Sequence, residues 1–194
     1  MKNNSLDVFP PGSIIGIMGG GQLGRMTALA AANLGYRCHI YTEETDSPAA
    51  QVSATTTVAS YKDHDALTQF AKSVDLITYE FENIPMSSIT LLNNIRSIRP
   101  SPSILEISQH RGKEKEFAVQ HGVNVAPYKI IEKISDLESA IKTIGTPSVL
   151  KTCRFGYDGK GQIVINEPEE IYSAWNQLSS DDLVLEQFVA FEKE

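Results

Sequence analysis

Short apolar runs alternate with amphipathic segments along the first hundred residues of the chain. Four apolar runs are predicted to be buried strands: 14–18, 37–42, 55–59 and 74–79. Three segments between and after them have helix-forming composition: 22–34, 63–73 and 86–94. Gly35 is a natural stop for the first helix, and Asp63 is a natural N-cap for the second. This alternation predicts an α/β domain with a parallel sheet and helices on both faces.

The pattern changes near residue 100, where Pro100-Ser101-Pro102 interrupts the chain, because a proline disfavours helix at the preceding residue. Beyond this point four strands are predicted: 128–131, 147–151, 162–165 and 183–188. Three helices are predicted: 103–120, 135–144 with Ser135 as its cap, and 168–178. We therefore expect two domains, residues 1–108 and residues 109–194.

Composition narrows the function classes. The net charge of −7 argues against a nucleic-acid-binding protein, which needs a basic face to neutralise phosphates. No apolar run is long enough to cross a membrane, and residues 1–13 lack the apolar core of a signal peptide. Cys38 and Cys153 are isolated and form no metal-binding pattern, and the four histidines are scattered. A reduced, cytoplasmic setting is the default expectation.

A first glycine cluster, Gly19-Gly20-Gly21-Gln22-Leu23-Gly24, lies between a predicted strand and a predicted helix. Such a turn lets a phosphate approach the helix N-terminus, as in dinucleotide-binding proteins. Glu43, Glu44 and Asp46 follow about 20 residues later, where a ribose-binding carboxylate is expected. The cluster is thus compatible with NAD binding, with another phosphate ligand, or with a simple turn that packs a helix onto a sheet.

A second glycine cluster, Gly156 to Gln162, lies between two predicted strands and follows Lys151. Such a loop can offer backbone N–H groups to a triphosphate, and a lysine on the preceding strand can reach the phosphates. The alternative is a solvent-exposed hairpin. The strand that runs into Glu186-Gln187-Phe188-Val189 suits a hinge that meets an adenine, and Glu194 can accept from ribose hydroxyls.

Together these segments resemble the ATP-grasp superfamily, and most closely its 5-(carboxyamino)imidazole ribonucleotide synthetase family. Five segments carry the resemblance: GIMGGGQLGRM at 16–26, TYEFENIP at 78–85, the Arg111/Lys115 segment, KTCRFGYDGKGQ at 151–162 and EQFVAFEKE at 186–194. The resemblance implies a Rossmann-like pre-ATP-grasp domain with a parallel sheet, followed by the small α+β lobe of an ATP-grasp domain.

The family uses ATP, Mg²⁺ and bicarbonate to carboxylate 5-aminoimidazole ribonucleotide through carboxyphosphate, in purine biosynthesis. The resemblance implies that Lys151, Tyr157 and Asp158 are catalytic. It implies ATP contacts from these residues: Arg111, Lys151, Gly156, Tyr157, Asp158, Gly159, Lys160, Gly161, Gln162, Glu186, Gln187, Phe188, Val189 and Glu194. It implies substrate contacts from these: Gly21, Gln22, Leu23, Glu80 and Asn83, with the glycine turn near the phosphate end of the ribonucleotide.

The family is longer than this chain and is commonly homodimeric. Its Mg²⁺ ligands and bicarbonate-binding residues are expected in a C-terminal lobe that this sequence does not contain. The sequence therefore predicts an incomplete and inactive ligase. Three other readings stay open at this point: a related ATP-grasp carboxylase or transformylase, an NAD-dependent oxidoreductase domain, and a binding module without catalysis.

Overall fold

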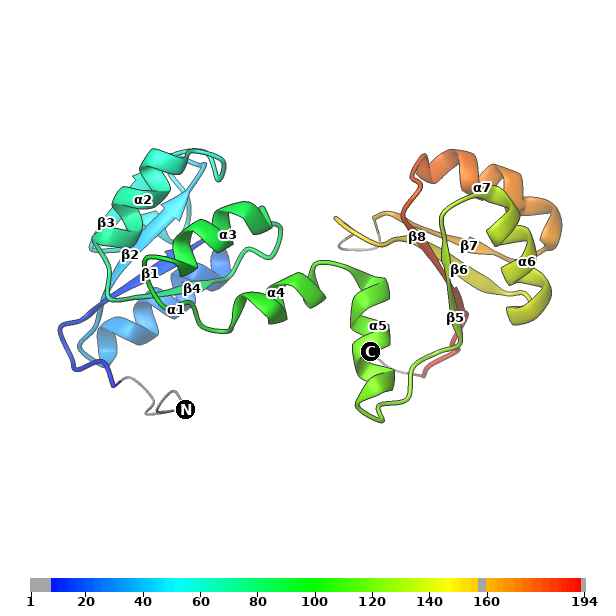
Figure 1. Ribbon diagram of the computed structural model, residues 1–194, viewed down its shortest axis with the longest axis horizontal. Coiled ribbons are helices and arrows are strands. Elements are labelled where there is room, and N and C mark those ends of the chain that lie inside the picture. Colours follow the sequence, from blue (N-terminus) through cyan, green and yellow to red (C-terminus); the bar gives the residue numbers. More distant parts are fainter. Residues whose placement is uncertain (1–7, 157–159, 193–194) are drawn as a thin grey trace. The chain divides into compact units, whose positions relative to one another are not determined.

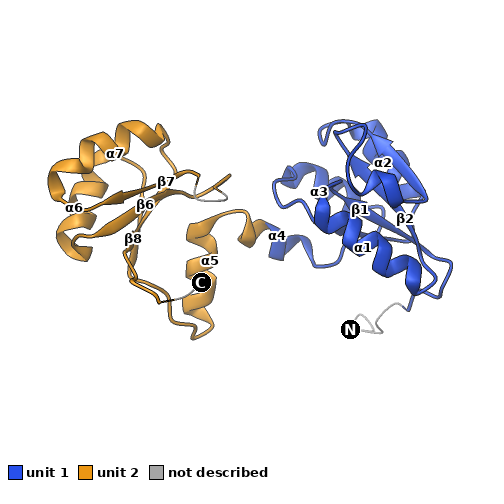
Figure 2. Cartoon of the chain, turned by 180° about the vertical axis from the view of Figure 1, so that it is seen from behind, with its two compact units in different colours: residues 1–105 blue, residues 106–194 orange. Residues whose placement is uncertain are grey.

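The computed structural model describes residues 8–156 and 160–192 of the chain. The chain forms two compact units, Met1–Leu105 and Glu106–Glu194 (Figure 2). The division falls after Leu105, close to the boundary that the sequence predicted after residue 108. We describe each unit by itself.

Unit 1 is built on a parallel sheet of four strands, and Figure 1 shows it in blue to cyan. The strands are β1 (Ile14–Met18), β2 (Arg37–Thr42), β3 (Thr55–Val58) and β4 (Leu76–Tyr79), in the order β3-β2-β1-β4. The helices are α1 (Gln22–Asn33), the 3₁₀ turn η1 (Ala50–Val52), α2 (His64–Lys72) and α3 (Met86–Asn93). The four strands were predicted to within two residues of these bounds.

Helices cover both faces of this sheet, as the alternating pattern predicted. On one face Ile17 and Ile40 pack with Ala28 of α1 and with Ala49 next to η1. The other face has the larger core, with buried side chains from these segments: β1, β2, α2, β4, α3 and Leu105. Because both faces are buried, the carboxyl ends of the parallel strands remain as the natural edge for a ligand.

Unit 2 is built on an antiparallel sheet. Its strands are β5 (Tyr128–Ile131), β6 (Ser148–Thr152), β7 (Gln162–Ile165) and β8 (Leu183–Gln187), in the order β5-β8-β6-β7. The helices are α5 (Arg111–Gln120), α6 (Ile134–Ile144), the 3₁₀ turn η2 (Pro168–Glu170) and α7 (Ile171–Leu178), while α4 (Pro102–Ser108) spans the division between the units. Helices α6 and α7 pack on one face through a core that includes Leu137, Ala174 and Leu185.

Two local predictions were wrong. The segment 103–120 is not one helix, because His110 has an extended backbone (φ −140°, ψ 107°) and its ring accepts a hydrogen bond from the Lys113 N–H, so it caps a new helix, α5. Ser135 does not cap α6, which begins one residue earlier at Ile134. The Asp136 carboxylate accepts from the Glu132 and Lys133 N–H groups there. The prediction that Asp63 caps α2 is confirmed.

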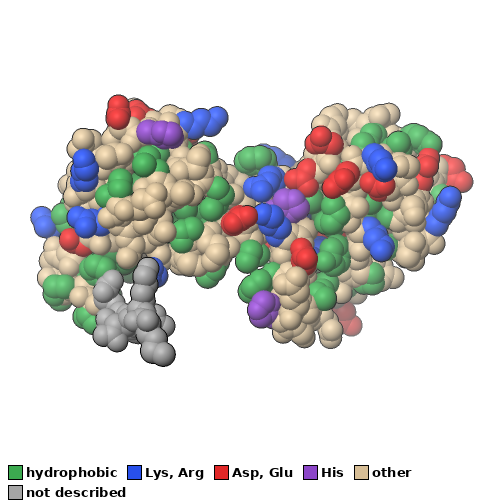
Figure 3. Space-filling view, in the orientation of Figure 1, with side chains coloured by type: hydrophobic (Ala, Val, Ile, Leu, Met, Phe, Trp, Pro, Cys, Tyr) green, Lys and Arg blue, Asp and Glu red, His purple; other side chains and the backbone are tan. Residues whose placement is uncertain are grey.

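No helix in the described part of the chain is long and apolar enough to cross a membrane. On the face shown in Figure 3, Lys and Arg side chains are interspersed with Asp and Glu side chains.

His39 gives unit 1 a stability that depends on pH. Its ring is buried, bonds Thr57 Oγ1 (2.8 Å) and Ser73 Oγ (2.9 Å), and has a pKa lowered from 6.5 because burial disfavours the charged form. The unfolded chain therefore binds the proton more readily, so the free energy of unfolding falls as pH drops below about 6.5. Urea unfolding followed by circular dichroism between pH 5 and pH 8 measures this dependence.

We expect His39→Gln to lose that part of the pH dependence, because no imidazole titrates there. His64→Gln is the matched control, since His64 is exposed at the start of α2. An unchanged pH dependence in His39→Gln would contradict the assignment.

Candidate functional site

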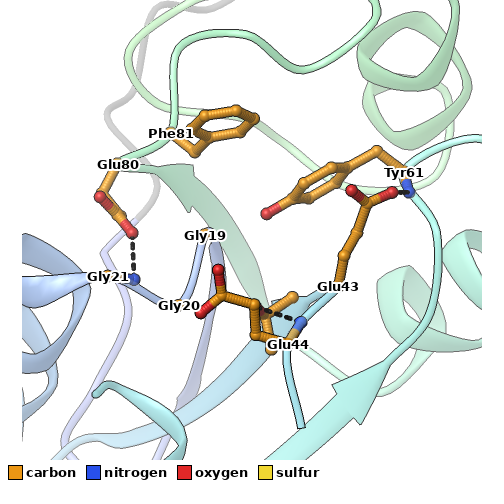
Figure 4. Close-up of a pocket in the computed structure, with 9 residues that line it drawn as sticks. Gly19, Gly20, Gly21, Glu43, Glu44, Tyr61, Glu80 and Phe81 are labelled. Carbon is orange, nitrogen blue, oxygen red and sulfur yellow. Dashed lines mark hydrogen bonds between the residues drawn. The ribbon is translucent and has the colours of Figure 1, made fainter. Parts of the chain in front are cut away.

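A pocket of about 270 Å³ lies at the carboxyl ends of β1, β2 and β4 in unit 1 (Figure 4). Three glycines, three glutamates, a threonine and two aromatic residues line it: Gly19, Gly20, Gly21, Glu43, Glu44, Glu80, Thr42, Tyr61 and Phe81. The sequence had placed the first glycine cluster and two of the later carboxylates near each other, and the pocket brings them together. Tyr61, Phe81 and Thr42 were not predicted, because they lie in separate segments whose pairing depends on the tertiary fold.

Glu80 occupies the N-terminus of α1. Its Oε1 accepts a hydrogen bond from the Gly21 N–H at 2.6 Å, and Gly21 is the N-cap residue of the helix. The glycines make room for it, because a Cβ on Gly19 would lie 2.7 Å from Glu80 Oε1 and one on Gly21 would lie 3.1 Å from it. Gly19 also has φ +116°, a backbone angle that residues with a side chain rarely adopt. The glycine turn therefore receives a carboxylate of the protein itself.

Glu43 is held in a fixed position at the end of β2. Its Oε1 accepts from Ser60 Oγ and from the Tyr61 N–H, each at 2.9 Å. The Tyr61 ring stacks on Phe81 at 5.5 Å between centroids, and Figure 4 shows its hydroxyl directed toward the glycine turn. Burial, followed by the charges of Glu43 and Glu80, raises the pKa of Tyr61, so its phenol is neutral and able to donate.

The predicted substrate residues do not all lie at this pocket. Gly21 and Glu80 line it, whereas Gln22, Leu23 and Asn83 are not among its lining residues. Leu23 lies on α1 with 61% of its surface exposed.

A second cluster lies in unit 2, around the Glu186 carboxylate of β8. Lys151 Nζ is 3.0 Å from Glu186 Oε2, and Lys115 Nζ is 3.2 Å from Oε1. Only 10% of the Glu186 side chain is exposed. Lys115 was not predicted as a site residue, although its spacing from Arg111 is a signal, since residues four apart share one face of a helix.

Arg111, the first residue of α5, holds the start of the glycine loop. Its guanidinium donates to the carbonyl oxygens of Thr152 (2.6 Å) and Gly156 (2.9 Å). Its backbone N–H donates to the Cys153 carbonyl at 2.9 Å. The predicted ATP-binding residues Arg111, Lys151 and Gly156 are thus brought to one end of β6.

The remaining predicted residues of this loop divide between described and undescribed positions. Gly161 accepts a backbone hydrogen bond from Thr152 at 2.8 Å, Gln162 is the pairing partner of Lys151, and Lys160 is exposed. Tyr157, Asp158, Gly159 and Glu194 lie outside the described residues.

Two backbone N–H groups of the predicted adenine hinge, Glu186 to Val189, donate hydrogen bonds to other parts of unit 2. The Gln187 N–H donates to the Pro127 carbonyl at 2.9 Å, and the Phe188 N–H donates to the Pro147 carbonyl at 3.2 Å. Phe188 and Val189 are exposed. Glu186 offers its carboxylate to lysines in this structure, and its predicted contact with adenine stays a prediction.

Among the described residues, His110, Cys153 and Asp182 have ligand atoms close enough to hold a metal ion. Their hydrogen bonds are satisfied without one. His110 Nδ1 accepts from the Lys113 N–H, so its Nε2 carries the proton and donates to Asp182 Oδ1 at 3.1 Å. Burial, and then a hydrogen bond to Asp182, raises the pKa of Cys153 to about 12, so the thiol is protonated. We assign these residues a structural role.

Both units match known domain families. The ribonucleotide synthetase pre-ATP-grasp domain matches residues 13–109, and the ATP-grasp domain matches residues 116–194. These two domains in this order define an ATP-grasp protein. More specifically, the chain belongs to the ribonucleotide synthetase family that carries the pre-ATP-grasp domain.

Several similar proteins are carboxyaminoimidazole ribonucleotide synthases. The chain is 43% identical over 186 residues to the N5-carboxyaminoimidazole ribonucleotide synthase of Brucella melitensis. The matched region covers 95% of this chain and 51% of that protein. A synthetase from Staphylococcus aureus crystallised with ADP has a TM-score of 0.91 and 34% identity, covering 95% of this chain and 50% of that one. An Aspergillus clavatus synthase in complex with ADP and 5-aminoimidazole ribonucleotide has a TM-score of 0.85 and 26% identity, covering 94% and 48%. The chain thus spans about half the length of these relatives.

The hydrogen bond from the Gly21 N–H to Glu80 predicts that unit 1 loses stability when the carboxylate is replaced by an amide of the same shape. Glu80→Gln removes the charge at the N-terminus of α1 and weakens the bond to the Gly21 N–H. We expect the free energy of unfolding to fall by roughly 0.5–2 kcal/mol, the range for a charge-assisted bond at a helix N-terminus. Urea unfolding measures it, with Glu44→Gln, at an exposed carboxylate of the same pocket, as control. Equal stability of the two variants would show that the carboxylate does not hold the helix.

Proposed function

We propose that this chain supplies a ribonucleotide pocket and a phosphate-binding lobe for the carboxylation of 5-aminoimidazole ribonucleotide in purine biosynthesis. In this reaction ATP phosphorylates bicarbonate, and the resulting carboxyphosphate delivers its carboxyl group to the amine of the ribonucleotide. The synthase activity of the relatives supports the proposal. The observation that carries it is the group of cations at the base of the second glycine loop.

The charges of this group suit a polyphosphate. Arg111, Lys115 and Lys151 contribute three positive charges near the end of β6, and Glu186 offsets one of them. Phosphoryl transfer depends on positioning and on neutralising charge more than on covalent chemistry. Lys151 lies at the position where its ammonium can move from Glu186 to a phosphate, and the strand fixes its backbone. The loop that follows would offer backbone N–H groups to the same phosphates.

In unit 1 the geometry favours a contact with the neutral part of the ribonucleotide. Glu43, Glu44 and Glu80 surround the pocket, and Glu80 already occupies the N–H of Gly21. Carboxylates repel a phosphate but accept hydrogen bonds from hydroxyl and amino groups. We therefore assign the ribose hydroxyls or the amino group to this pocket, rather than the phosphate end that the sequence suggested.

The remaining parts of the activity are proposals of the same kind. Mg²⁺ would neutralise phosphate charge, and it requires oxygen ligands. In the described part of unit 2, the carboxylate nearest the lysines is Glu186, and both of its oxygens face lysines. We therefore assign no Mg²⁺ ligand to Glu186. The proposed homodimer rests on the family resemblance, and the proposed cytoplasmic setting rests on the composition of the sequence.

Nucleotide binding tests the proposal. We expect ATP to bind the chain in isothermal titration calorimetry, and Lys151→Met to weaken binding at least tenfold, because one desolvated charge contact to phosphate is worth about 1.5–3 kcal/mol. Lys129→Met is the control, since Lys129 is exposed on β5, which is separated from β6 by β8. Lys129 pairs with Leu185, whose side chain belongs to the core under α6 and α7.

Titration with NAD⁺ tests the competing hypothesis that the first glycine cluster binds a dinucleotide. Binding of NAD⁺ without binding of ATP, or equal ATP affinity in Lys151→Met and Lys129→Met, would contradict the proposed function.

A further inference from the structure

Lys115 is a half-buried lysine to which the family resemblance assigns no role. It lies on α5, one helical turn after Arg111, and only 16% of its side chain is exposed. Its Nζ is 3.2 Å from Glu186 Oε1 and 5.6 Å from the centre of the Tyr128 ring. Tyr128 and Glu186 are directly paired across strands β5 and β8. A salt bridge and a cation–π contact therefore hold the ammonium from two neighbouring strands.

Glu186 divides its two oxygens between two lysines from different elements. Lys115 on α5 takes Oε1, and Lys151 on β6 takes Oε2. The carboxylate is 10% exposed, so water supplies little of the solvation that its charge requires. A charge buried in this way is stable only while a partner of opposite sign remains in contact.

The two lysines differ in what else holds them. Lys151 lies at the base of the glycine loop, where Arg111 also reaches the Thr152 and Gly156 carbonyls, and it is the more exposed lysine at 23%. Lys115 lies over the Tyr128 ring and is 16% exposed. When a polyphosphate arrives at the loop, Lys151 is therefore the lysine that can turn toward it.

We propose that Lys115 is a positioning residue, which keeps Glu186 charged and in place when the phosphates of a nucleotide draw Lys151 away. The inference rests on the proposed ATP site at Lys151. In the free protein, the salt bridge to Glu186 holds the Lys151 side chain in place. When Lys151 moves from Glu186 to a phosphate, the salt bridge to Lys115 leaves the buried carboxylate with a cation.

This arrangement has a measurable consequence. Without Lys115, the departure of Lys151 would leave Glu186 with no cation, and the carboxylate would take up a proton from the buffer. ATP binding to Lys115→Met should therefore be coupled to the uptake of up to about one more proton than binding to the wild-type chain. The uptake is measured at pH 7 by calorimetry in two buffers of different ionisation enthalpy.

We expect Lys115→Met to bind ATP roughly tenfold to hundredfold more weakly, the order expected when a buried polar group is left without a hydrogen-bond partner. Lys115→Arg should restore affinity and remove the extra proton uptake. The double variant Lys115→Met/Glu186→Gln should show no extra uptake, because the amide does not titrate in this range. Lys113→Met is the matched control, since Lys113 lies on the same helix and pairs with the exposed Glu106.

The outcomes separate this inference from the proposed function. If the wild-type chain does not bind ATP, both are overturned. If it binds and Lys115→Met shows unchanged affinity, or weaker affinity without extra proton uptake, the positioning role alone is overturned. Circular dichroism verifies the fold of each variant, and Lys115→Gln, which retains a donor without the charge, replaces Lys115→Met if the methionine variant is unfolded.

Discussion

A carboxylate that is withdrawn from water must meet a cation or a hydrogen-bond donor, and both units are organised around this constraint. In unit 2 the Glu186 carboxylate joins α5 to β6 through Lys115 and Lys151. In unit 1 the half-buried Glu80 carboxylate lies against the N-terminus of α1 and accepts from the Gly21 N–H. In each unit the residues that face the proposed ligand are thus held by an acidic side chain of the protein.

This constraint changes the meaning of the first glycine cluster. A glycine turn before a helix usually indicates a phosphate site, because backbone N–H groups and the helix dipole favour an anion. Here the anion is Glu80, and Gly19 and Gly21 leave the space that its side chain fills. The same turn therefore presents a carboxylate, which favours hydroxyl and amino groups over a phosphate. The acidic pocket of unit 1 and the cationic lobe of unit 2 are suited to different parts of the proposed reaction.

Much of the fold could be predicted from local pattern, because buried strands and amphipathic helices impose their periods on the sequence. Strands 14–18, 37–42, 128–131 and 162–165 have the predicted bounds, and Asp63 caps α2. The break between α4 and α5 could not be predicted in this way, since it depends on the hydrogen bond that the His110 ring accepts from the Lys113 N–H. The same holds for the site. Lys151 could be predicted from the glycine loop that follows it, whereas the contacts of Glu186 with Lys115 and Lys151 join segments far apart in the sequence. The stacking of Tyr61 on Phe81 likewise depends on the tertiary fold.

The most direct test of the account is a crystal structure of the chain with a non-hydrolysable ATP analogue, in which the distances from Glu186 to Lys115 and to Lys151 are measured. In the free chain these distances are 3.2 Å and 3.0 Å. The account predicts that Lys151 leaves Glu186 for a phosphate oxygen, while Lys115 stays within salt-bridge distance. An analogue bound elsewhere, or bound at the loop with the salt bridge between Lys151 and Glu186 intact, would contradict it.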